Sequence, residues 1–151
     1  MPEHSMRPFV QVAAICQTPI QETNGLFSVF RIMDRVPIQG FTDEMQPQPL
    51  HMLSIVIILK AGEMSGKYTV KIVPETPSGK RLPPLNITAL FERDERGVIH
   101  CAPLGLIAEE EGLYWFDIML EQDVLTRIPL RVMYQKIQPM PGMPIPPQPG
   151  H

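Results

Sequence analysis

Two cysteines and one histidine are the residues whose types suit nucleophilic chemistry. Cys16 and Cys101 are the two cysteines of the chain, and His100 directly precedes Cys101. A catalytic cysteine needs a base within hydrogen-bond reach. Neighbours on a strand point to opposite faces, so His100 and Cys101 cannot form this pair directly. We therefore predict no enzyme and no cofactor, and a small cysteine-dependent enzyme built around Cys101 or Cys16 with His100 is the weakest alternative.

Acidic residues gather in two segments that could form loop tips. Asp43 and Glu44 belong to the segment 34–44, and Glu109–Glu111 belong to the segment 104–111. Calcium sites need several converging oxygen ligands, whereas three consecutive glutamates are more often a solvated turn. A ligand-binding module for calcium or carbohydrate that uses these tips is the first alternative. The four histidines show no ligand spacing, so we predict no metal.

The composition indicates one globular domain. The chain has 151 residues, 44% of them hydrophobic, which suffices for a core without metal or disulfides. Its net charge of −3 argues against a general nucleic-acid binder. Two cysteines are too few for a disulfide framework, and whether they pair is open. No apolar run is long enough for a membrane span, and no signal peptide is recognisable, so we expect a cytoplasmic protein.

Prolines mark the end of the predicted domain. The chain has 18 prolines, about 12% of its residues against an average near 5%, and six lie in the last thirteen residues. We expect an N-terminal extension at residues 1–8, a β-sandwich domain at residues 9–136 and a proline-rich flexible tail at residues 137–151. The tail also fits the minimal Pro-x-x-Pro pattern, which leaves a docking peptide open.

Short strands separated by turn signals dominate the pattern. We expect strands at 9–16, 25–33, 52–59, 67–73, 86–92, 98–101, 113–121 and 124–134. We expect a loop at 37–49 and a hairpin turn at Asp94–Gly97. The stretch 52–59 is apolar on both alternating faces, which is typical of a strand covered on both sides. The pattern predicts an all-β, antiparallel Greek-key β-sandwich of about seven to eight strands. Pro129 lies inside the last strand, so an edge or a bulge is expected there.

The corner before the penultimate strand resembles that of immunoglobulin-like sandwiches. Glu110-x-Gly112-x-Tyr114 matches their acidic-x-Gly-x-Tyr corner. The chain lacks the Cys…Trp…Cys spacing of antibody domains, since Trp115 follows Tyr114. The resemblance implies an immunoglobulin-like fold outside the antibody type.

The chain also resembles a group of short bacterial proteins catalogued only as a domain of unknown function. The shared pattern is a short strand ending in Cys16, an Asn24-Gly25 turn, a strand ending at Asp34, then Gly112-Leu113-Tyr114 and Pro129-Leu130-Arg131-Val132. The resemblance covers roughly residues 9–134. It implies a small β-sandwich and supplies no activity, cofactor or catalytic residue.

Alternation along the last hairpin predicts which residues face the core. We expect inward side chains at Tyr114, Phe116, Ile118, Leu120, Val124, Thr126, Ile128, Leu130 and Val132. The predicted outward set comprises Leu113, Trp115, Met119, Leu125, Arg127, Arg131 and Met133, with Asp117 beside them. Trp, Met and Arg are enriched at protein interfaces, so this set is the candidate interface. Cover of Trp115 by the loop 37–49, or a small-molecule or sugar platform, stays open.

The sequence therefore favours a non-enzymatic β-sandwich module that acts through protein–protein contacts. We expect self-association or docking onto a larger assembly, through the candidate interface or by pairing of an edge strand. The tail would serve as a flexible attachment. The expected partner is a protein or a second copy, with no nucleic acid and no membrane span.

Overall fold

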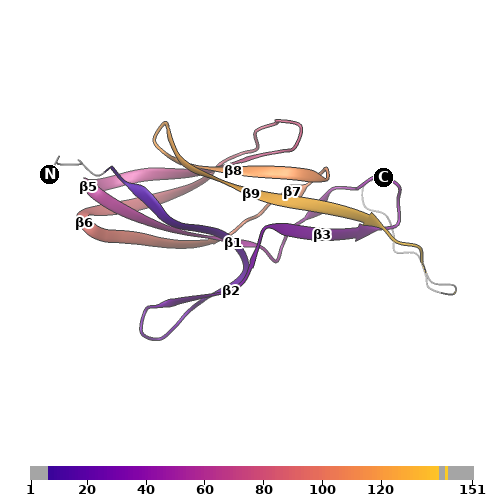
Figure 1. The fold of residues 1–151 in the computed structure, drawn as a ribbon, viewed down its shortest axis with the longest axis horizontal. Helices are drawn as coiled ribbons and strands as arrows, with labels where there is room; N and C mark the ends of the chain where they lie inside the picture. Colours follow the sequence, from indigo (N-terminus) through magenta and orange to yellow (C-terminus); the bar gives the residue numbers. More distant parts are fainter. Residues whose placement is uncertain (1–6, 140–141, 143–151) are drawn as a thin grey trace.

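All regular secondary structure in the described part of the chain is β-strand. The computed structural model describes residues 7–139 and 142, and these contain nine strands and no helix (Figure 1). Within this part, no helix is available that could cross a membrane. The strands are β1 (Phe9–Gln21), β2 (Phe27–Met33), β3 (Arg35–Gly40), β4 (Gln48–Pro49), β5 (Ser54–Glu75), β6 (Leu85–Pro103), β7 (Ile107–Ala108), β8 (Gly112–Leu120) and β9 (Asp123–Lys136). The predicted extension at residues 1–8 and tail at residues 137–151 fall mostly outside the described residues.

A long hairpin of β5 and β6 forms the frame of the fold. The two strands pair antiparallel along nearly their whole length, with irregularities between Lys60 and Ser65. Gly62 lies at this irregularity with a φ of +58°, which costs little only for glycine. On the partner strand, a Cβ at Gly97 would lie 2.4 Å from the carbonyl oxygen of Leu59. Glycine at these two positions therefore lets the ladder bend without ending.

The continuity of β5 and β6 corrects the sequence interpretation. The predicted strands 52–59 and 67–73 are parts of one strand, and so are 86–92 and 98–101. The turn predicted at Asp94–Gly97 is wrong, because β6 runs through it. Glycine and charged residues, which usually mark a turn, here accompany a bulge in a continuing strand.

The bend divides the strands into the two layers of a sandwich. Residues 54–60 of β5 pair with β1, and residues 70–75 pair with β8. The first layer is therefore β2-β1-β5-β6, and the second layer is β6-β5-β8-β9-β3 (Figure 1). One hydrophobic core joins them, with contributions from Ile15, Ile55, Ile57, Ile72, Phe116 and Leu130. The predicted all-β sandwich is confirmed.

One strand pair departs from the antiparallel arrangement. β3 pairs parallel with β9, beginning with Arg35 opposite Arg131, and the other pairs of the described strands are antiparallel. The segment 37–49 was expected to be a loop, but its first residues belong to β3, whose Ile38 is buried. Pro129 lies on β9 before this pairing starts, so the predicted edge position is confirmed.

The corner before β8 has the geometry that the sequence predicts. The Tyr114 hydroxyl donates a hydrogen bond of 2.8 Å to the carbonyl oxygen of Glu110, and the Tyr114 side chain is fully buried. Gly112 has a φ of +129°, and a Cβ there would lie 2.8 Å from Pro77. This is the tyrosine corner of immunoglobulin-like sandwiches.

Candidate functional site

Trp115, the centre of the predicted interface, lies beneath an arginine. The Arg127 guanidinium lies 5.1 Å from the centre of the Trp115 ring, in a cation–π arrangement. Arg127 Nε donates to Asp117 Oδ1 at 2.5 Å, and Arg127 Nη2 donates to Glu75 Oε2 at 3.0 Å. The cover of Trp115 therefore includes a side chain of the neighbouring strand that is itself held in place by two carboxylates.

The carboxylate of Asp117 anchors this arrangement. Asp117 belongs to the predicted outward set, yet it is only 4% exposed. Besides Arg127, it has Arg81 Nη2 at 3.9 Å. The hydrogen bond that Arg127 donates to Asp117 raises the pKa of Arg127, which stays charged. A buried carboxylate is stable only when paired and hydrogen-bonded, so these contacts are required within the chain itself.

The other residues of the candidate interface do not form one open patch. Leu113 and Met119 are half-buried, whereas Arg127, Arg131 and Met133 are exposed. The orientations expected for Leu125 and Val124 are wrong: Leu125 packs against the core, and Val124 is 48% exposed. A bulge opposite the step from Ile118 to Met119 adds one residue to β9 and reverses the alternation beyond it. The role of this set as an interface stays a prediction.

The acidic residues of the two predicted loop tips have separate partners. Glu110 Oε1 accepts hydrogen bonds from the Ser78 backbone N–H at 3.0 Å and from the Ser78 hydroxyl at 2.8 Å. These bonds hold the pKa of Glu110 below its usual value. Asp43 pairs with Lys136, and Glu111 accepts a hydrogen bond from the backbone N–H of Tyr134. Within residues 7–139, no three acidic, histidine or cysteine side chains converge as a metal site.

The two thiols lie on the same face of the first layer, and His100 lies on the other. Cys101 is opposite Val56 on β5, whereas His100 is opposite Ile57, a core residue. Both cysteines are free, and burial raises the pKa of each thiol. β5 lies between their strands, so their Cα atoms are at least about 9 Å apart, too far for a disulfide. The geometry does not assemble a nucleophile and a base.

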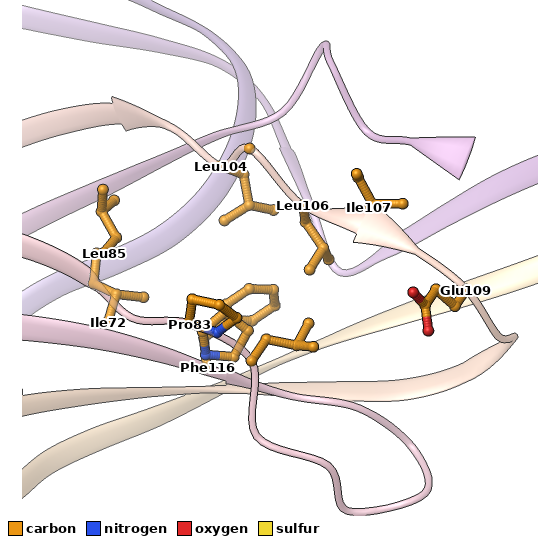
Figure 2. A pocket seen from close by; sticks show the side chains of 11 residues that line it. Ile72, Pro83, Leu85, Leu104, Leu106, Ile107, Glu109 and Phe116 are labelled. Carbon is orange, nitrogen blue, oxygen red and sulfur yellow. The ribbon is translucent and has the colours of Figure 1, made fainter. Parts of the chain in front are cut away.

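An apolar recess opens between the two layers on one side. It has a volume of about 260 Å³, with Leu104 and Leu106 on one side and Ile72, Pro83 and Phe116 on the other (Figure 2). Glu109 is its charged lining residue. Sites for small molecules usually have at least about 300 Å³ and several converging polar groups. This recess has neither, so we assign it no ligand.

The outer face of the first layer is a second candidate surface, which sequence reasoning missed. Ile15, Ile55 and Ile57 point into the core, so the residues between them point outward. The ladder places fourteen residues on this outer face, here called the apolar face: Val12, Ala14, Cys16, Thr18, Ile20, Ser28, Phe30, Ile32, Ser54, Val56, Ile58, Ile99, Cys101 and Pro103. None of the fourteen is Asp, Glu, Lys or Arg. Charge lies at the two ends of the face: Lys60 follows Ile58 in the same alternation, and Ser28 Oγ donates to Glu22 Oε1 at 2.8 Å.

Large side chains of the apolar face are open to solvent. Ile32 is 69% exposed, Phe30 53% and Ile99 45%, while Cys16 and Val56 at the centre are buried. The exposure of Ile32, Phe30 and Ile99 shows that no described segment covers these three side chains fully. Extended exposed apolar surface on a folded domain marks an interaction site. The apolar pattern of 52–59 was a signal for it, since it predicted apolar residues on both faces of one strand. On the outer face of that strand Val56 is buried and Ile58 is half-buried.

The comparisons with known proteins add little to this geometry. No protein-family model matches the chain, and no curated protein matches its sequence. Among solved structures, the chain is similar to an immunoglobulin-like protein of Pseudomonas aeruginosa. The similarity has 10% sequence identity and a TM-score of 0.43, and it covers 85% of this chain and 98% of that one.

Proposed function

We propose that the protein is a non-enzymatic interaction module that acts through protein–protein contacts made by the apolar face. The observation that carries this proposal is the exposure of Phe30, Ile32 and Ile99 on a sheet face whose fourteen residues include no charged side chain. Burial of such side chains is favourable at about 25 cal/mol per Å² of apolar surface. A contact that covers them therefore stabilises the bound state.

The apolar face fits this role better than the surface around Trp115. Trp115 already has Arg127 over its ring, and Arg127 already has Asp117 and Glu75 as partners. A partner at that surface would have to displace or accommodate these charges at a desolvation cost. At the apolar face, binding displaces water from uncharged side chains.

The remaining expectations for this chain are also proposals. β1 continues past Cys16 to Gln21, so the strand end predicted at Cys16 is wrong. The corner at Tyr114 supports membership of the bacterial family catalogued as a domain of unknown function. The two free thiols support a cytoplasmic location, where cysteines stay reduced.

Site-specific photo-crosslinking in the native host tests the proposed function. A photoreactive phenylalanine analogue replaces Phe30 on the apolar face in one variant. In a matched control it replaces Leu90, which is 50% exposed and lies on the β6 segment of the second layer. We expect a crosslinked protein at position 30 and none at position 90. The proposal is wrong if position 30 yields no crosslinked protein, or if both positions yield the same products.

A further inference from the structure

We propose that the partner of the apolar face is a second copy of this chain, so that two first layers stack face to face about a two-fold axis. This inference rests on the proposed function and names the partner of the same surface. In such a two-fold dimer, each chain contributes the same surface patch to the interface. Two packed sheets lie about 10 Å apart, which leaves room for interdigitated Ile, Val and Phe side chains.

The lack of charge on the apolar face is the first argument for a second copy. Phe30, Ile32 and Ile99 offer a partner apolar contact and no ionic one. An acidic or basic partner would therefore gain nothing here from its charge. The surface that fits is equally uncharged and apolar, and every copy of this chain carries one.

The same charge distribution disfavours a lipid surface as the occupant. Proteins that lie on membranes usually surround their apolar side chains with Lys and Arg, which attract anionic headgroups. The described ladder positions in line with this face include one cation, Lys60. It lies at the end of the face, paired with Phe9 of β1. The chain as a whole has a net charge of −3.

The size of the face is the second argument. Three strands about 4.8 Å apart, β1, β5 and β6, paired over seven or eight residues, together with the projecting β1–β2 hairpin, give roughly 600 Å² in projection. A corrugated sheet has more accessible surface than its projection. A stable interface buries about 800 Å² on each partner, so one complete face is enough.

The free edge of β2 is less suited to self-association than the face. Arg31 has a φ of +56°, a left-handed conformation that interrupts regular strand geometry, and its guanidinium donates to Gln17 Oε1 at 3.0 Å. Irregular backbone and charged side chains are features that hinder pairing at an edge strand. The geometry therefore favours stacking of faces over extension of the sheet.

Sedimentation equilibrium of the purified full chain tests the inference. We vary the chain concentration from about 1 to 100 µM, because the weakest interfaces of this size have dissociation constants in the micromolar range. The measured mass should rise with concentration towards twice 17.1 kDa. Ile32→Glu should weaken association at least about tenfold, because it buries a charge in the apolar contact. Met52→Glu is the control, since Met52 is 73% exposed and Ile32 69%, but Met52 lies outside the apolar face. It should associate like the wild type.

Several results would overturn the second copy as partner. These are a monomeric wild type at about 100 µM, equal dissociation by Met52→Glu, or undiminished association of Ile32→Glu. Binding of the monomer to phosphatidylcholine vesicles would point to lipid instead. If Ile32→Glu fails to unfold cooperatively, Ile99→Glu takes its place, because Ile99 is also exposed on this face.

Hydrogen exchange separates the stacked arrangement from edge pairing. Stacking leaves the exchange of those β2 amides that do not bond to β1 nearly unchanged on association. Protection of these amides in the dimer would contradict stacking. A monomeric chain that nevertheless crosslinks to another protein through position 30 would leave the proposed function intact and refute only the second copy.

Discussion

The two outer faces of the sandwich hold large apolar side chains in different environments. On the second layer, Trp115 lies under Arg127, which Asp117 and Glu75 hold in place. On the first layer, Ile32 and Phe30 are more than half exposed, and none of the fourteen residues of the apolar face is charged. The residue types alone pointed to the Trp115 surface. The comparison teaches that residue type alone does not show whether an apolar side chain is available to a partner, because charged side chains of the same chain can cover it.

Arg127→Met should give the largest loss of stability. It leaves the buried carboxylate of Asp117 with only Arg81, whose Nη2 is 3.9 Å away. We expect the melting temperature to fall by several degrees, because an uncompensated buried charge is strongly destabilising. Thermal unfolding by circular dichroism measures this. Adding Asp117→Leu should restore much of the loss, and if it does not, the ion pair is not what stabilises this face.

Acid should affect the corner of the second layer and spare the apolar face. The pKa of Glu110 is lowered from 4.5 by hydrogen bonds from Ser78. Its contribution to stability is therefore present above pH 4.5 and is lost as the pH falls below 4.5 through the folded-state pKa. Ser78→Ala should flatten the fall in stability over this range, measured by urea unfolding at each pH. An unchanged slope would show that the two hydrogen bonds do not govern the acid response.

Salt should distinguish the forces at the two faces. Association through the apolar face involves no ion pair at its described positions, so added NaCl should leave the dissociation constant within about twofold, and sulfate should lower it. Sedimentation equilibrium at several salt concentrations measures this constant. A steep weakening with NaCl would instead implicate the charged surface around Arg127.

Much of the second layer could be predicted from the sequence. Tyr114, Phe116, Ile118 and Leu120 alternate without interruption, and all four are buried as expected. The corner at Glu110 was predictable because its spacing is local. The orientation of Leu125 was not predictable. One extra residue in a bulge reverses the alternation there, and the local sequence carries no signal for that bulge.

The first layer shows what alternation alone cannot decide. In β1 both sets of alternate residues are apolar near Ile15 and Cys16, so the pattern does not say which set meets the core. Only the pairing with β5 settles that Ile15 points inward. β3 was missed because proline usually argues against a strand, and Pro37 lies inside this one, which pairs parallel with β9.

Arg31→Gly should give the smallest effect and tests the edge beside the apolar face. Glycine adopts the φ of +56° at this position without the steric cost that Arg31 bears. We expect stability to change by less than about 1 kcal/mol, since relief of strain is offset by the added entropy of the unfolded chain. Urea unfolding gives this value. Removal of the Arg31 charge should also leave self-association unchanged. Stronger association of this variant would show that the edge of β2 takes part in the contact.

The most direct test of the account compares one charge placed on each outer face. Ile32→Glu alters the apolar face, and Met133→Glu alters the exposed end of the Trp115 surface, where Met133 is 37% exposed. Both are measured by sedimentation equilibrium beside the wild type. The account predicts that Ile32→Glu sediments as a single chain of 17.1 kDa while Met133→Glu keeps the mass of the wild type. Dissociation by Met133→Glu together with intact association of Ile32→Glu would contradict it.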